Sequence, residues 1–101
     1  MKTMWLLLAL AAGTINGPLR ASDDLSQSEI RALVQQGKIL SLETILVSYP
    51  ESTYGKLLDL EAERKHDRVI YELEFLQVDG RVIELEIDAV SGRLIKQEID
   101  D

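Results

Sequence analysis

Few side chains in this sequence could carry out chemistry, and His66 is the first to consider. It is the only histidine, and it lies in the charged segment 63–68, which we interpret as a connection between strands. Nucleophilic hydrolysis or transition-metal binding needs further groups oriented on the imidazole. The spacing around His66 supplies none. We therefore interpret His66 as a solvated turn residue and predict no catalytic residue in this chain.

Two aspartates, Asp79 and Asp88, invite comparison with calcium loops. An EF-hand loop alternates acidic ligands and ends in a distal Glu, and neither feature surrounds these residues. Because a glycine follows each aspartate closely, we interpret Asp79 with Gly80, and Ser91 with Gly92, as structural turn residues. The chain also has no cysteine, which excludes thiolate ligands. We predict no metal site and no cofactor.

The remaining candidates are glutamates in a segment that nearly repeats itself. Residues 71–83 read YELEFLQVDGRVI, and residues 83–95, twelve positions later, read IELEIDAVSGRLI. Apolar and charged residues alternate in both copies, which is typical of strands with one buried face. Because the period is even, both copies keep their apolar residues on the same side. Two similar hairpins of one antiparallel meander explain the repeat.

The first hairpin loop follows from the faces of the paired residues. A two-residue Asp-Gly turn would place Phe75 opposite Glu84, whereas a three-residue loop over residues 78–80 places Phe75 opposite Ile83. Directly opposed residues share a face, so only the longer loop pairs apolar residues with one another. We predict this three-residue loop with a left-handed glycine, and the same loop again over residues 90–92.

The same register has a consequence on the outward side of the sheet. It places Glu72 opposite Glu86 and Glu74 opposite Glu84, and like charges across a strand pair are destabilising. Lys96 would lie beside Glu86 and relieve part of the repulsion. The simpler interpretation is a solvated charged face that maintains solubility and prevents edge-to-edge aggregation. The alternative is an acidic surface that docks a basic protein partner or binds cations, with these four glutamates as its binding residues.

Composition restricts what such a surface could bind. The chain has 101 residues, 46% of them hydrophobic, and a formal net charge of −7, which is typical of one small folded domain. An acidic domain is a poor match for nucleic acids or anionic membranes, which select lysine and arginine. A basic protein partner or cations remain as candidates for this surface, and Tyr49 and Tyr54 are a second candidate contact for a partner. The sequence leaves the oligomeric state open.

Residues 1–21 differ in character from the rest of the chain. Lys2 precedes an apolar run over residues 4–12, and a less apolar stretch follows up to Ala21, which is the layout of a secretory signal peptide. The run is shorter than the roughly 20 residues needed to span a bilayer. We predict cleavage after Ala21 and an exported domain over residues 22–101, periplasmic or secreted, without a stable membrane span.

Two short helices are predicted at the start of this domain. Ser26 followed by Glu29 is a capping box, and Gly37 provides a stop for the first helix. Ser41 can cap the second helix, and Pro50 ends it. Each helix has one apolar stripe. Because isolated helices of this length are marginal in water, both must pack on the rest of the domain.

Four strands follow, over residues 56–64, 69–76, 82–88 and 93–99. The second hairpin loop would pair Ile87 with Ile95. The inner faces of the first and last strands are expected to carry Leu58, Leu60 and Ala62, and Ile95, Gln97 and Ile99. The predicted fold class is α+β, with two short N-terminal helices packed on one face of a four-stranded antiparallel sheet.

Four segments resemble a PepSY domain: ILSLETIL over residues 39–46, VIYEL over 69–73, VDGR over 78–81 and DAVSGRL over 88–94. The similarity is to the small secreted bacterial form and extends from about residue 24 to residue 99. It implies helices packed on an antiparallel sheet, no catalytic residues, and inhibition or regulation of peptidases outside the cytoplasm. A propeptide precedes its own peptidase, whereas this sequence ends at Asp101, so the target would be met in trans.

These observations predict a non-enzymatic binding domain of the cell envelope that modulates a peptidase or another envelope protein. The alternative, from a different class, is a structural or sensory envelope domain whose acidic sheet face binds cations or a basic partner.

Overall fold

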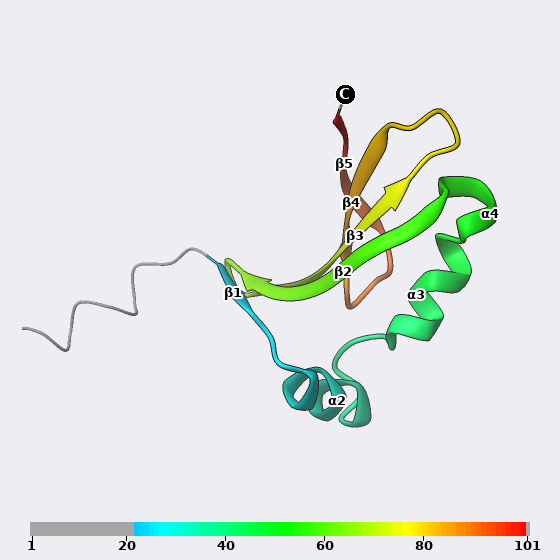
Figure 1. The fold of residues 1–101 in the computed structure, drawn as a ribbon. Coiled ribbons are helices and arrows are strands. Elements are labelled where there is room, and N and C mark those ends of the chain that lie inside the picture. Colours follow the sequence, from blue (N-terminus) through cyan, green and yellow to red (C-terminus); the bar gives the residue numbers. More distant parts are fainter. Residues whose placement is uncertain (1–21, 101) are drawn as a thin grey trace, which may run out of the picture.

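A twisted antiparallel sheet with helices on one side forms the domain (Figure 1). The computed structural model describes residues 22–100; Asp101 and residues 1–21, where the signal peptide is predicted, lie outside the described residues. The five strands pair in sequence order: β1 (Ser22–Asp24), β2 (Lys56–Lys65), β3 (Arg68–Leu76), β4 (Val82–Asp88) and β5 (Leu94–Asp100). The predicted α+β meander is confirmed, and β1 is a strand that the sequence analysis missed.

Helix α2 (Gln27–Gln35) begins and ends where the sequence predicts. The Ser26 hydroxyl accepts a hydrogen bond from the Glu29 amide at 3.1 Å, and the Glu29 carboxylate accepts one from the Ser26 amide at 2.8 Å. This is the predicted capping box, and these hydrogen bonds lower the pKa of Glu29. Beyond the helix, Gly37 has a left-handed φ of 72°, which suits a residue without a Cβ.

Helix α3 (Leu42–Ser48) is capped by the Ser41 hydroxyl, which accepts a hydrogen bond from the Thr44 amide at 3.2 Å. Pro50 follows its end, as predicted. Pro50 is also the N-cap of one further helical turn, α4 (Glu51–Tyr54), which the sequence analysis did not predict. Proline suits this place because its fixed φ and missing amide are compatible with the start of a helix.

The first hairpin has the predicted register and loop. The Gln77 amide donates to the Arg81 carbonyl at 2.8 Å, which leaves residues 78–80 as the loop, with Gly80 at a φ of 90°. The pairs on the inner face are all apolar: Phe75 with Ile83, Leu73 with Leu85, and Tyr71 with Ile87. The choice of loop from the faces of paired residues is therefore confirmed.

The second hairpin is one residue longer, so the predicted repetition of the loop is wrong. The Asp88 amide donates to the Arg93 carbonyl at 2.9 Å, which leaves residues 89–92 in the loop. Ile87 consequently lies opposite Leu94, and a register shift between Glu86 and Ile87 restores the expected pairs further along β5. The residue left over in the shift is Ile95, which therefore does not lie on the inner face.

Ala89 explains the longer loop. Its amide donates to the Val69 carbonyl at 3.0 Å, and its carbonyl accepts from the Leu40 amide at 2.8 Å. Both backbone groups are thus engaged by β3 and by the segment before α3, and they are not available to pair with β5. Long-range contacts of this kind are not encoded in the local repeat.

Strand β2 is longer than predicted and contains a bulge. The shift between Leu57 and Asp59 leaves Leu58 without a partner, and its side chain is 45% exposed. The predicted inner position of Leu58 is therefore wrong, because one extra residue reverses the alternation. Beyond the bulge, Leu60 lies opposite Leu73 and Ala62 opposite Tyr71, on the inner face as predicted.

The charged segment 63–68 is not a connection, which corrects a further expectation. Its first three residues complete β2, Arg68 begins β3, and only His66 and Asp67 form the turn. Their φ angles of 50° and 67° are both left-handed, as in a two-residue type I′ hairpin turn. Aspartate and histidine tolerate this conformation better than most residues. Charged residues therefore continue both strands here.

The core lies between the inner face of the sheet and the helices. Its largest fully buried side chains come from α3, β3 and β4: Ile45, Tyr71, Leu73, Phe75, Leu85 and Ile87. Tyr49 is also buried, and its hydroxyl donates to the Gly92 carbonyl at 2.8 Å. The Tyr54 ring packs on Phe75 with centroids 5.5 Å apart. Tyr49 is thus a core residue and Tyr54 packs, partly buried, against the core, so their predicted role as exposed anchors for a partner is wrong.

Replacement of Tyr71 by Phe is expected to destabilise the domain by about 1–2 kcal/mol. The Tyr71 hydroxyl donates to the Leu40 carbonyl at 2.8 Å, and the side chain is only 1% exposed. Its loss leaves a partly buried carbonyl without this donor. Urea unfolding should show a lower midpoint with an unchanged slope. Tyr54→Phe is the control, because that hydroxyl makes no hydrogen bond with the described residues; equal losses in both variants would contradict this assignment.

Candidate functional site

The side of the sheet opposite the helices carries a concentration of carboxylates. The register places Glu72 opposite Glu86 and Glu74 opposite Glu84. We call these four residues the acidic face. Because opposed residues share a face, neighbouring strands extend its negative charge with Asp59, Glu61 and Glu98. The four glutamates that the sequence singles out are therefore brought together on one surface.

Basic groups neutralise only part of the acidic face. Lys65 Nζ lies 3.6 Å from Glu86 Oε2. Lys96 lies opposite Glu86, as expected, but its ammonium contacts Glu98 at 3.5 Å instead. The other three glutamates form no ion pair with a lysine or arginine of the described residues. The surface therefore has excess negative charge.

Burial and the neighbouring negative charges change the ionisation of two of these four glutamates. Burial, and then repulsion by Glu63, Glu84, Glu86 and Glu61, raises the pKa of Glu72 to about 7. Burial, and then repulsion by Glu98 and other carboxylates, also raises the pKa of Glu84. A raised carboxylate pKa means that the folded protein disfavours the ionised form. A bound cation or cationic side chain would reverse this effect.

The structure places Asp79 and Gly80 in the loop of the first hairpin. Asp79 accepts hydrogen bonds from the Arg81 amide at 3.0 Å and from Arg81 Nε at 2.9 Å. These hydrogen bonds, the backbone one first, lower the pKa of Asp79. The carboxylate therefore organises its own turn, which is the structural role expected from the sequence pattern.

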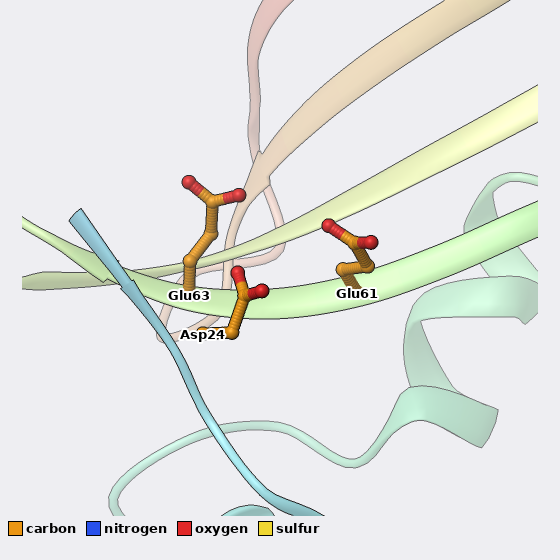
Figure 2. A group of neighbouring side chains, drawn as sticks. All are labelled: Asp24, Glu61 and Glu63. Carbon is orange, nitrogen blue, oxygen red and sulfur yellow. The ribbon is translucent and has the colours of Figure 1, made fainter.

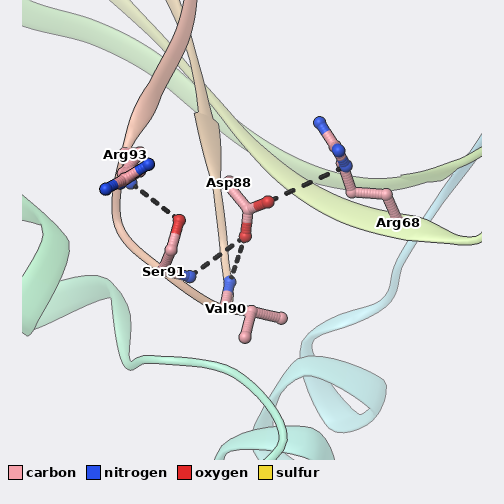
Figure 3. Close-up of polar contacts among 5 residues, drawn as sticks. All are labelled: Arg68, Asp88, Val90, Ser91 and Arg93. Atoms are coloured by element: carbon pink, nitrogen blue, oxygen red, sulfur yellow. Dashed lines mark hydrogen bonds and ion pairs between the residues drawn. The ribbon is translucent and has the colours of Figure 1, made fainter.

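Asp88 organises the second loop in a similar way (Figure 3). Its Oδ1 accepts hydrogen bonds from the amides of Val90 at 2.8 Å and Ser91 at 3.0 Å, and its Oδ2 lies 3.7 Å from Arg68 Nε. Hydrogen bonds from the Ser91 and Val90 amides lower the pKa of Asp88, and Arg68 adds to this effect. Gly92 closes the loop with a φ of 79°.

His66 lies exposed in the turn between β2 and β3. Its side chain makes no hydrogen bond or ion pair with the residues that the structure describes. It therefore lacks the oriented partner that a catalytic histidine needs. The acidic face likewise contains no nucleophile or general base held by a second group.

The structure also brings together three carboxylates that the sequence analysis missed. One ligand oxygen from each of Asp24, Glu61 and Glu63 lies within 4.8 Å of the other two (Figure 2). The i, i+2 spacing of Glu61 and Glu63 places both on one face of a strand. Asp24, however, comes from β1, whose pairing with β2 has no signal in the local sequence.

No helix within residues 22–100 is both long enough and apolar enough to cross a membrane.

The fold and the surface define a small α+β domain whose distinctive feature is charge on one sheet face rather than a catalytic constellation. A scan against protein-family models matches residues 25–98 to PepSY, the peptidase propeptide and YPEB domain. Because the match covers most of the chain, this protein belongs to the PepSY family. A search of curated proteins and a search of solved structures found no match.

Membership of the PepSY family indicates which kind of site this chain is expected to have. PepSY domains are generally non-catalytic propeptide or regulatory domains, and they are linked to the regulation of peptidases. They typically occur in exported bacterial proteins. A binding surface is therefore the kind of site to expect in this chain.

Proposed function

We propose that this protein is an exported, non-enzymatic regulatory domain that binds a basic surface of a peptidase, or of another envelope protein, through its acidic face. The observation that carries the proposal is the clustering of Glu72, Glu74 and Glu84 without a basic partner among the described residues, which the fold itself does not require. A partner that supplies lysine or arginine side chains would relieve the repulsion between them. The signal-peptide pattern over residues 1–21 supports export.

The chemistry of this surface favours reversible association. Exposed charges at a protein interface speed the encounter of the two proteins and fix their relative orientation more than they add affinity. Exposed charge pairs are screened by salt, with a Debye length of roughly 8 Å at physiological ionic strength. Binding should therefore weaken as the salt concentration rises, which suits a reversible regulator.

The first test is inhibition of secreted peptidases by the purified protein, together with recovery of a partner from envelope extract. We expect Glu74→Gln/Glu84→Gln to weaken binding of that partner by about tenfold, mainly through a slower association rate. Association rates at several salt concentrations would measure the effect. The variant should also show a smaller salt dependence than the unmodified protein.

Glu43→Gln/Asp67→Asn is the matched control. It removes the same number of negative charges from exposed residues outside the acidic face. Binding by this control should be close to that of the unmodified protein. An equal loss of binding in both variants would show that net charge, and not the acidic face, determines binding. The absence of any peptidase inhibition or partner would contradict the proposal itself.

A further inference from the structure

Three carboxylates from two strands converge at one end of the charged sheet surface (Figure 2). Asp24 on β1 lies directly opposite Glu63 on β2, and Glu61 precedes Glu63 by two residues and so shares its face. One oxygen of each lies within 4.8 Å of the others. All three available donors are carboxylate oxygens, which are the ligands of hard divalent cations.

The burial of Glu63 is a second and independent observation. This residue is only 8% exposed, whereas Asp24 and Glu61 are exposed. The described residues give its carboxylate no hydrogen bond and no ion pair. Its oxygens still reach the surface, because every fully buried side-chain oxygen in the described residues has a hydrogen-bond partner. A largely buried carboxylate without a counter-ion is unfavourable, and binding a metal offsets this cost.

The basic residues nearest in sequence are engaged elsewhere. Lys65 contacts Glu86, and Arg68 contacts Asp88. Arg64 directly follows Glu63 on β2, and consecutive side chains of a strand point to opposite faces, so Arg64 points away from Glu63. On this face, Glu72 lies opposite Glu61 and adds a further negative group beside the cluster. Lys65 shares the face of Glu63 but is paired with Glu86, so no ion pair within the described residues neutralises Glu63.

We propose that Asp24, Glu61 and Glu63 bind a divalent cation, with Ca²⁺ preferred, and that this ion fastens β1 to β2. Calcium accepts oxygens at about 2.4 Å in irregular geometry, so two of its ligands can lie up to about 4.8 Å apart. Magnesium holds its ligands at about 2.1 Å and demands octahedral geometry, which would require a closer approach. Water molecules would complete the coordination.

The proposed ion would act at β1, the short strand at one edge of the sheet. Strand β1 has only three residues, and the backbone contact that follows it is the hydrogen bond from the Leu25 amide to the Ala62 carbonyl at 2.8 Å. An ion that bridges Asp24 to two residues of β2 would hold this strand in place. With three carboxylates and partial exposure, the affinity should resemble that of extracellular calcium modules, with a Kd of about 0.1–1 mM.

The test uses protein produced from the full sequence and freed of metal with a chelator. Titration with CaCl₂ should raise the melting temperature saturably, by about 5–10 °C at ten times the Kd. MgCl₂ should give a smaller shift, and NaCl at matched ionic strength should give no saturable shift. Hydrogen exchange at the Leu25 amide should slow when calcium is added, because this amide follows the bridged strand.

Asp24→Asn and Glu63→Gln should each weaken calcium binding at least about tenfold in calorimetry. Asp24 is exposed, so its variant remains informative even if Glu63→Gln alters folding. Glu98→Gln, on the same side of the sheet but outside the cluster, should keep the full calcium response. An equal response in Asp24→Asn and Glu98→Gln, or a shift that NaCl reproduces, would overturn the proposal.

The site goes beyond the proposed binding of a peptidase and does not depend on it. A calcium response without peptidase inhibition would support the cation site and contradict the regulatory proposal. Inhibition without a calcium response would do the reverse. The two failures are therefore distinguishable in the same protein preparation.

Discussion

Replacement of Gly55 by Ala is expected to destabilise the domain by about 3 kcal/mol or more and to lower the melting temperature by at least about 12 °C. Gly55 joins α4 to β2 with a φ of 110° and a ψ of −166°, a region that is essentially restricted to glycine. A Cβ there would collide with the Leu76 carbonyl oxygen and lie 2.8 Å from its carbon. The collision is with backbone, so no side chain can move aside.

The matched control is Gly80→Ala. Gly80 is also left-handed, with a φ of 90°, but a Cβ there meets nothing within 4 Å. Only the cost of a left-handed backbone at a residue with a Cβ remains, and the domain should lose about 1 kcal/mol of stability. Thermal and urea unfolding of both variants would measure the difference. Similar losses in the two variants would show that the approach of Gly55 to the end of β3 is looser than the geometry indicates.

This glycine also marks what local sequence could not predict. The alternation of apolar residues was sufficient to place Phe75 opposite Ile83 and to choose the first loop, because those pairs are close in the chain. The need for glycine at position 55 arises from the backbone of Leu76, which lies at the end of β3, about twenty residues further along the chain. Only the assembled sheet brings the two segments together.

The bulges have the same origin. The displacement of Leu58 and Ile95 from the inner face follows from one unpaired residue in the β2–β3 pair and one in the β4–β5 pair. For Ile95, the reason is the engagement of Ala89 by Val69 and Leu40. A pattern of alternating apolar and polar residues contains no signal for such an extra residue, because the same residue types would also fit a regular strand.

The candidate site divides in a similar way. The acidic face could be predicted because its four glutamates lie on two strands of one hairpin, whose register the apolar residues determine. The carboxylate cluster could not, because all three described helices separate Asp24 from Glu61 and β1 has no apolar alternation. Its assembly depends on backbone pairing between β1 and β2 alone.

The ionisation of Glu72 leads to a pH dependence of stability in the metal-free protein. The folded-state pKa of about 7 exceeds the ordinary value of 4.5. Between these pH values the folded protein keeps a proton that the unfolded chain has released, so the free energy of unfolding falls as the pH rises. Above pH 7 the carboxylate is ionised in both states, and the folded state retains the full penalty of burial and repulsion.

Glu72→Gln should therefore stabilise the domain by about 1–2 kcal/mol at pH 8, and the gain should shrink as the pH falls from 7 towards 4.5. The figure is smaller than the full shift would give, since Glu72 is only partly buried and water screens the repulsion. Urea unfolding at pH 5, 6, 7 and 8 with a chelator present would measure it. Glu43→Gln, on α3 and outside the acidic face, should show no such gain. If Glu72→Gln stabilised the domain equally at pH 5 and pH 8, the gain would come from packing, and the charge of Glu72 would have no part in it.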